Sequence, residues 1–212
     1  MLTPLVILLV ILGGTWGFAA DRIAARWPAH DDGSIRHIDW RTPVVVLVGA
    51  ASLGALTTRF PEPVPAVVFG AYLVALVLLL ATDLDQRLLP DVITLPAIPL
   101  ALVFSLTGLN PLVPPGVLLI AIAAAIGLPL LLWLVSIPFG AGAIGQGDLK
   151  LLVSVGLMVG PLRLVYGAVY GALLAGIVLV LLLVLRRITL KTFVPYGPFL
   201  IIGAIWAVLV IV

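Results

Sequence analysis

The chain has 212 residues, of which 63% are hydrophobic and 9% are charged, and its formal net charge is +2. A soluble domain does not need so large an apolar fraction, so the composition predicts a membrane protein. The absence of cysteine excludes disulfides, thiol catalysis and cysteine-based zinc sites, and the basic residues flank predicted helix ends, which argues against a nucleic-acid partner.

Apolar runs joined by short connections rich in proline and glycine make up most of the chain. A transmembrane helix needs roughly 20 mostly apolar residues, and runs near that length recur throughout. We therefore predict an all-α, polytopic membrane protein with about eight transmembrane helices in a single membrane domain, residues 1–212. The expected helices are residues 2–19, 43–56, 66–82, 92–107, 117–137, 148–159, 162–185 and 194–212.

The one long polar stretch, residues 20–42, is predicted to be a short cytosolic loop. It mixes acidic and basic side chains, which is typical of a solvated loop. Trp27 and Trp40 are expected to anchor its ends at the membrane interface. His30 and His37 are expected to be solvated rather than metal-bound, so the sequence predicts neither a metal site nor a cofactor.

Three aspartates, Asp83, Asp85 and Asp91, lie where the third predicted helix gives way to the fourth. A carboxylate at or inside a bilayer is costly, so each is a functional candidate. Pro90 and Asp91 are expected to start the fourth helix, with Asp91 as a cap or an orienting group. Arg87 is expected to be a charge that sets topology.

A second motif, Gly145-Gln146-Gly147-Asp148, ends in a carboxylate and opens a short predicted helix. Residues 148–159 cover only about 18 Å of a roughly 30 Å hydrocarbon core. If Gly160-Pro161 lies at the outer surface, Asp148 is recessed and residues 139–147 dip into the membrane. An unbroken helix through Pro161 is the alternative.

Small residues in the seventh predicted helix and a proline-rich turn before the eighth complete the chain. Gly167, Gly171 and Ala175 recur at intervals of four, which is typical of a helix packing face. Pro195-Tyr196-Gly197-Pro198 is expected to shape the entry to the last helix, with Tyr196 as an interfacial anchor.

The distribution of lysine and arginine predicts the orientation. One set of alternating loops holds nine of these residues, whereas the other holds only Arg59 and Arg163. Cytosolic loops carry the excess of basic residues, so both termini are expected outside the cytosol of a plasma-membrane protein. Asp83, Asp91 and Asp148 then lie on the cytosolic side. The nine are Arg22, Arg26, Arg36, Arg41, Arg87, Lys150, Arg186, Arg187 and Lys191.

Asp83 and Asp148 form the candidate catalytic pair. Two facing carboxyls, one ionised and one protonated, can activate water and protonate a carbonyl oxygen, which hydrolyses a peptide without a metal. The plainer alternative is that both are ordinary helix-end carboxylates, since aspartate near a helix N-terminus is a favourable cap. Two other interpretations remain open: a transporter or proton relay using the same carboxylates, and a non-catalytic scaffold.

Five neighbouring residues are expected to support this pair. Gly145 and Gly147 would let a substrate strand lie beside Asp148, although turn glycines alone also account for them. Lys150 would hold a carboxylate ionised or contact substrate, or else anchor the helix as a positive-inside charge. Asp85 and Asp91 add carboxylates near Asp83.

At these residues the chain resembles the type IV prepilin peptidases, the GxGD aspartic membrane proteases. The similarity runs from about residue 67 to the C-terminus, with its pieces in the same order and at similar spacing. The pieces are Asp83 to Asp91 with Pro90, then Thr94-Leu95-Pro96, then residues 145–152, and finally residues 195–200.

The resemblance implies an aspartic endopeptidase that removes the short basic leader of prepilin or pseudopilin substrates of type IV pilus and type II secretion systems. Cleavage would occur at the cytosolic face, typically after a glycine and just before the substrate's hydrophobic helix. Asp83 and Asp148 match the family's catalytic pair. The substrate and the lipid bilayer are the expected partners, and no cofactor is implied.

The N-terminal part departs from the family pattern. Residues 20–42 replace a larger cytosolic insert that carries paired cysteines in many members, and these cysteines are absent here. Their absence counts against zinc binding and against N-methyltransferase activity.

Overall fold

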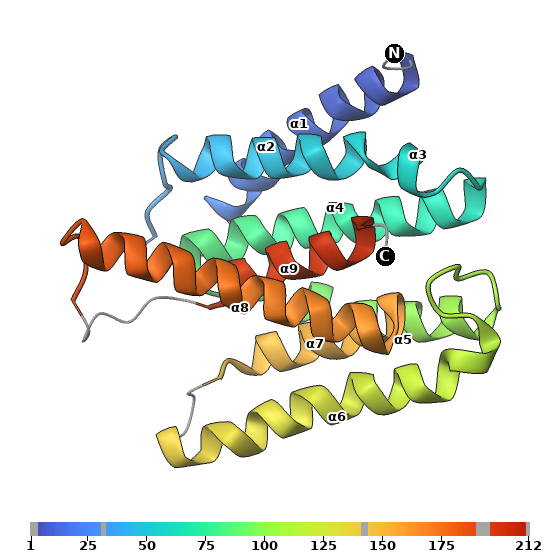
Figure 1. Cartoon of the computed structure of the whole chain (residues 1–212). Helices are drawn as coiled ribbons and strands as arrows, with labels where there is room; N and C mark the ends of the chain where they lie inside the picture. The colour runs from blue at the N-terminus through green and yellow to red at the C-terminus, as the bar shows by residue number, and fades with distance from the viewer. Residues whose placement is uncertain (1–3, 31–32, 141–143, 190–195, 211–212) are drawn as a thin grey trace.

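The computed structural model describes residues 4–30, 33–140, 144–189 and 196–210. In this part of the chain every regular element is helical, and the long helices lie roughly side by side (Figure 1). The α-helices are α1 (Pro4–Ala24), α2 (Arg41–Gly54), α3 (Leu56–Arg59), α4 (Pro63–Gln86), α5 (Asp91–Leu106), α6 (Leu118–Ser136), α7 (Gln146–Val159), α8 (Pro161–Val184) and α9 (Gly197–Leu209).

Helices lie at all eight expected positions, and α3 is a single turn that prolongs α2, so the all-α, polytopic membrane prediction is confirmed. Not every one of these helices has the length of a full span. Within the described residues, five segments are long and apolar enough to cross a membrane, rather than about eight. They are Pro4–Ala24, Arg41–Arg59, Pro63–Gln86, Pro115–Ser136 and Pro161–Val184.

The count is lower because α5, α7 and α9 are short. The 14 residues of α7 cover about 21 Å, well below the roughly 30 Å of a hydrocarbon core. Gly160 ends this helix with a φ of 82°, a conformation that favours glycine, and Pro161 then begins α8. The expected break after α7 is therefore confirmed, and the alternative of one unbroken helix through Pro161 is wrong.

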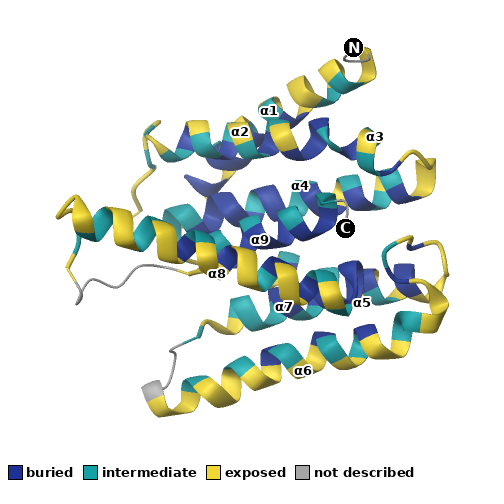
Figure 2. Ribbon diagram, in the orientation of Figure 1, coloured by how far each residue is buried: buried dark blue, intermediate teal, exposed yellow. Residues whose placement is uncertain are grey.

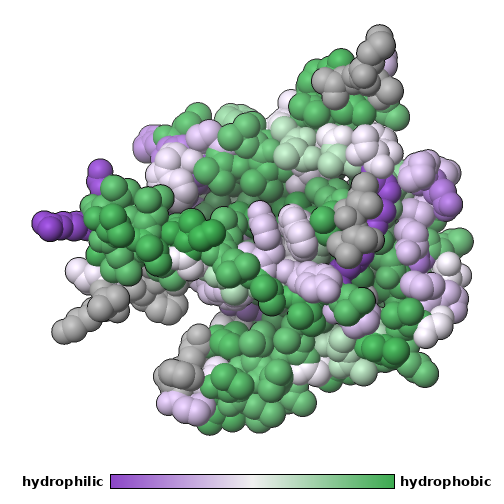
Figure 3. All heavy atoms as spheres, in the orientation of Figure 1, coloured by the Kyte–Doolittle hydropathy of each residue, from purple (hydrophilic) through white to green (hydrophobic). Residues whose placement is uncertain are grey.

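The interior of the bundle is formed by α4, α7 and α9, which carry most of the buried positions (Figure 2). Phe69 and Leu73 on α4, Leu151 and Met158 on α7, and Ile201 on α9 are among the fully buried side chains. By contrast, α6 and α8 keep apolar side chains exposed along much of their length. Apolar residues also dominate the face seen in Figure 3, as a surface in contact with lipid requires.

Glycines allow α1 and α2 to pack with their backbones in close contact. A Cβ added to Gly13 would lie 2.8 Å from the carbonyl carbon of Gly49, and one added to Gly17 would lie 2.7 Å from the Cα of Val46. Any side chain at these positions would push the two helices apart. The first two helices therefore form a tightly packed hairpin.

Glycines also allow close backbone packing between α8 and α9. A Cβ added to Gly167 would lie 2.8 Å from the carbonyl oxygen of Gly203, and one added to Gly171 would lie 2.6 Å from the carbonyl oxygen of Phe199. Ala175, the third small residue of the stripe, is buried. The predicted packing face on this helix is confirmed.

Candidate active site

Asp83 lies in the last turns of α4, just before the helix ends at Arg87 in a left-handed conformation. Its residue is 5% exposed, and its Oδ2 atom is buried without a hydrogen-bond partner among the described residues. The backbone of Gly197, at the start of α9, lies against this carboxylate. A Cβ added to Gly197 would lie 2.7 Å from the Asp83 Cγ, so any larger residue there would displace this carboxylate.

Asp148 lies in the first turn of α7, where the positive end of the helix dipole favours a carboxylate. The carboxylate also accepts a hydrogen bond from the backbone N–H of Gly145, the N-cap residue. This bond is the reciprocal half of a capping box, so the plainer interpretation of Asp148 as a capping residue is partly correct. The same bond fixes the direction in which the carboxylate points.

The two glycines of this motif have different neighbours. A Cβ added to Gly147 would lie 2.8 Å from the Cβ of Leu89, which lies on the connection between α4 and α5. Gly147 therefore lets α7 approach that connection closely. A Cβ added to Gly145 would lie 3.1 Å from Asp148 Oδ2, so this glycine leaves the carboxylate room.

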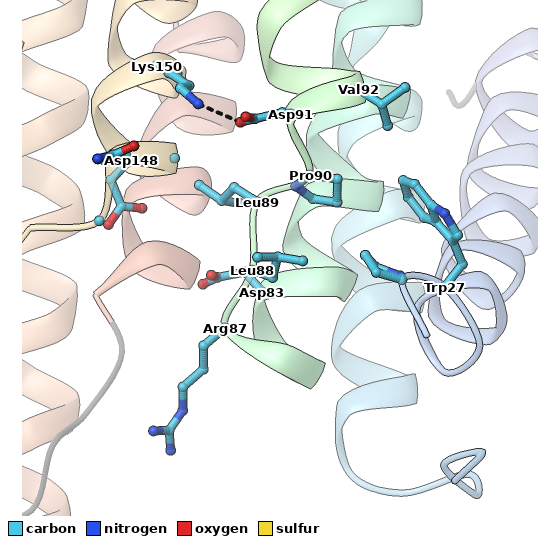
Figure 4. A pocket seen from close by; sticks show the side chains of 14 residues that line it. Trp27, Asp83, Arg87, Leu88, Leu89, Pro90, Asp91, Val92, Asp148 and Lys150 are labelled. Atoms are coloured by element: carbon cyan, nitrogen blue, oxygen red, sulfur yellow. Dashed lines mark hydrogen bonds and ion pairs between the residues drawn. The ribbon is translucent and has the colours of Figure 1, made fainter. Parts of the chain in front are cut away.

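A single pocket of about 610 Å³ brings the two motifs together. The Asp83 and Asp148 carboxylates interact electrostatically, and Figure 4 shows them pointing into the same space from α4 and α7. A cavity that exposes two carboxyls from separate helices can hold a water and a carbonyl group between an acid and a base. Its lining residues are Trp27, Pro28, Asp83, Arg87, Leu88, Leu89, Pro90, Asp91, Val92, Gly145, Gln146, Gly147, Asp148 and Lys150.

Two of the predicted supporting residues form an ion pair at the rim. Lys150 on α7 donates to Asp91 at the start of α5 over 2.6 Å, with side chains 28% and 58% exposed (Figure 4). The pair bridges two helices, and Asp91 lies in the first turn of α5. Lys150 therefore contacts the carboxylate of Asp91.

Asp85 does not line this pocket, in contrast to the expectation that it would support the pair there. Its side chain is 1% exposed and points toward the segment between α1 and α2, where three cationic or ionisable side chains meet it. Arg41 donates to it over 2.9 Å, His30 Nε2 lies 3.0 Å away, and Arg36 forms a close ion pair. Residues 83 and 85 of one helix thus face different surroundings.

The predicted loop between the first two helices is more ordered than its polar composition suggested. Asp21 is fully buried and is held by Arg22, Arg36 and Thr42. Burial opposes the charge of Arg36, but the hydrogen bond and charge of Asp21 raise the pKa of the Arg36 guanidinium above its ordinary value. Asp21, Arg22 and Arg36 therefore neutralise one another in a packed cluster, rather than being individually solvated.

Two residues at or beside the pocket could not be identified from sequence as functional. Trp27 was interpreted as an interfacial anchor and Gly197 as part of an entry turn, yet one lines the pocket and the other touches Asp83. Tyr196 also lies near the site, where burial and the Asp148 carboxylate raise the pKa of its hydroxyl. Lys191 and Pro195 lie outside the described residues.

Comparison with protein families gives one match. The sequence pattern of the Type IV leader peptidase family matches residues 70–185, a stretch that contains both aspartate motifs. Comparison with solved structures finds no match.

Several curated proteins named "Prepilin leader peptidase/N-methyltransferase" are similar to the chain. The protein from Pseudomonas putida is 35% identical over 179 residues, which is 82% of this chain and 60% of the relative. The protein from Burkholderia pseudomallei strain 1026b is 34% identical over 181 residues, or 81% of this chain and 56% of the relative. The one from Aeromonas salmonicida strain A449 is 38% identical over 133 residues, covering 60% and 44%. The chain thus spans at most about 60% of the length of these relatives.

Proposed function

Because the chain belongs to the type IV leader peptidase family, we propose that it is an aspartic endopeptidase that removes the leader from prepilin-like proteins, with Asp83 and Asp148 as its catalytic residues. The observation that carries this proposal is the shared pocket, into which separate helices direct the two carboxyls. Of the two activities in the relatives' names, the proposal concerns the leader peptidase and not the N-methyltransferase.

In the proposed reaction the two carboxyls carry one proton between them. The ionised carboxyl removes a proton from water, whose oxygen attacks the carbonyl carbon of the scissile bond. The protonated carboxyl gives its proton to the carbonyl oxygen, forming a neutral tetrahedral intermediate. As this intermediate collapses, the carboxyl that took the proton from water gives it to the leaving nitrogen and the carbon–nitrogen bond breaks. The other carboxyl takes a proton from a hydroxyl of the intermediate, so a carboxylic acid product forms and the pair returns to its starting state.

The surroundings of Asp83 suit this chemistry. Its Oδ2 is buried, no protein donor among the described residues occupies it, and Gly197 presents only backbone beside it. A carboxyl with an oxygen that no protein donor occupies remains able to exchange a proton with water and substrate. Asp148 has one fixed donor, Gly145 N–H, which orients it without occupying both of its oxygens.

We further propose that the pocket opens to the cytosol of a plasma-membrane protein whose termini lie on the opposite side. Arg22, Arg36, Arg41 and Lys150 belong to the end of the bundle that holds the pocket, and Arg59 and Arg163 lie at the other end (Figure 1). Because the chain has no cysteine, single cysteines can report this orientation. An impermeant maleimide should label Leu109→Cys in intact cells and Ser34→Cys only after permeabilisation.

The peptidase proposal is tested by co-expressing the chain with type IV prepilins and following loss of the leader by mass. Asp83→Asn and Asp148→Asn should each abolish processing while the protein remains folded and membrane-bound. Glu62→Gln is the matched control, since it makes the same chemical change at the exposed opposite end of α4 and should leave processing unchanged. Continued processing by either aspartate variant would refute the assignment.

A further inference from the structure

We propose that Trp27 and Pro28 form a substrate-contacting wall of the pocket, and that Asp85 and Gln86 are positioning residues that hold this wall in place. The inference rests on the proposed peptidase function and deepens it, because it assigns part of the pocket to an extended peptide segment away from the scissile bond. It also assigns a positioning role to the ion-pair cluster around Asp85, which takes no part in the proposed reaction.

The wall lies apart from the acidic pair. Figure 4 shows Asp83 and Asp148 directed to one side of the α4–α5 connection and Trp27 on the other, with Leu88 to Pro90 between them. All of these residues line the same cavity. A peptide held at the two carboxyls therefore continues across this connection toward Trp27, where the indole is 40% exposed and presents an aromatic face.

The backbone around Trp27 is held at both ends of the short segment. Its N–H donates to the carbonyl of Ile23 over 2.8 Å, which extends the last turn of α1 as far as the indole. Gln86, at the end of α4, donates from Nε2 to the carbonyl of Pro28 over 2.6 Å and lies 3.4 Å from that of Ala24. The wall is thus tied to the helix that carries Asp83.

Asp85 fastens the remainder of the segment to the same helical turn. His30, Arg36 and Arg41 all converge on its carboxylate, whose side chain is 1% exposed. Arg36 also pairs with the buried Asp21, so the cluster joins α1, the segment after it and α4. Asp83 faces the substrate pocket from the last turns of α4. Asp85 and Gln86, next to it on the same helix, hold the wall of Trp27 and Pro28 in position relative to Asp83.

The test uses a synthetic internally quenched peptide with a basic leader, a cleavage glycine and an apolar segment, together with two versions trimmed from either end. On the long peptide, Trp27→Ala should raise KM about tenfold at nearly constant kcat. A change of this size corresponds to the binding free energy of one aromatic contact. On one of the trimmed peptides, which no longer reaches the wall, the variant and the native protein should have equal KM. A purely structural defect would impair every peptide alike.

Further variants separate contact from positioning. Trp27→Phe should restore most of the affinity, and Gln86→Ala should raise KM about threefold on the long peptide only, the effect of one lost hydrogen bond. Trp40→Ala is the matched control and should change nothing. Trp40 is a second exposed tryptophan of the same segment, and it does not line this pocket.

Binding is measured separately, from the anisotropy of the labelled long peptide with Asp148→Asn protein, so that the two proposals can fail independently. Cleavage by the native protein with a KM that does not depend on Trp27 would overturn the wall and leave the peptidase proposal intact. Absence of cleavage, together with binding that is weakened by Trp27→Ala, would overturn the peptidase proposal and support the wall. A rise in KM that persists on all three peptides would also overturn the wall.

Discussion

Asp83 and Asp85 lie two residues apart on α4, yet one faces the pocket and the other faces the segment between α1 and α2. Asp85 is surrounded by Arg36 and Arg41, which neutralise it, and by the His30 imidazole. Asp83 has a second carboxylate across the pocket and an Oδ2 without a protein donor among the described residues. Both side chains are buried, so burial alone does not distinguish them.

The difference between the two faces lies in their partners. A buried carboxylate compensated by cations has little freedom to exchange a proton, and its removal leaves the cations uncompensated. A buried carboxylate opposite another carboxylate is costly for folding and suited to proton transfer. The comparison therefore assigns structure to Asp85 and chemistry to Asp83.

The largest expected effect is that Asp83→Asn lowers activity without lowering stability, whereas Asp85→Asn lowers stability. Asp83→Asn should reduce leader cleavage at least about 10³-fold, because one half of the acid–base pair is lost, and should leave the unfolding temperature unchanged or raise it. Asp85→Asn should lower the free energy of unfolding by about 3 kcal/mol, because three partners lose their anion. Thermal unfolding in detergent and single-turnover cleavage measure the two quantities. Strong destabilisation by Asp83→Asn would contradict the comparison.

A smaller effect is expected when the contact between α9 and the pocket face is altered. Gly197→Ala places a methyl group against the Asp83 carboxylate and should displace it, reducing kcat by about 100-fold, the order of effect of misplacing a reacting group by about 1 Å. Gly176→Ala on α8 is the control, since an added Cβ there meets nothing within 4 Å. Equal activities of the two variants would show that Asp83 tolerates movement.

The smallest effect is expected for the ion pair at the pocket rim. Lys150→Ala removes the partner of Asp91, and since Asp91 is 58% exposed, solvent screening should keep the loss of stability below about 1 kcal/mol. The double exchange Lys150→Asp with Asp91→Lys should recover most of that loss in a double-mutant cycle. A loss in cleavage that the exchange fails to recover would mean that Lys150 acts on the substrate or on Asp148 instead.

Helix positions and the pocket's acidic pair could be predicted because they depend on local signals. Apolar runs, a proline after a glycine at 160–161 and carboxylates at helix ends each follow from nearby residues. Helix lengths were less predictable, because α7 is ended by the positive φ of Gly160 rather than by loss of apolar residues.

The partners of Asp85 and the position of Trp27 could not be predicted from the sequence. His30, Arg36 and Arg41 are separated from Asp85 by 44 to 55 residues, and nothing local marks them as its partners. Polar composition suggested a solvated loop because sequence shows the signs of charges but not which charges meet. Gly197 carried one available signal, a glycine between two prolines at a helix start, but only the fold shows that Asp83 is its neighbour.

The glycine contacts between α1 and α2 have a consequence for biosynthesis. Among the described residues, the partners of the Asp21 carboxylate, namely Arg22, Arg36 and Thr42, lie within this hairpin or the segment that links its helices. The hairpin can therefore close, with that buried charge already compensated, before α4 has left the ribosome. Asp85 then arrives at a preassembled set of cations, so the order of synthesis favours docking of the later helices onto a finished N-terminal unit.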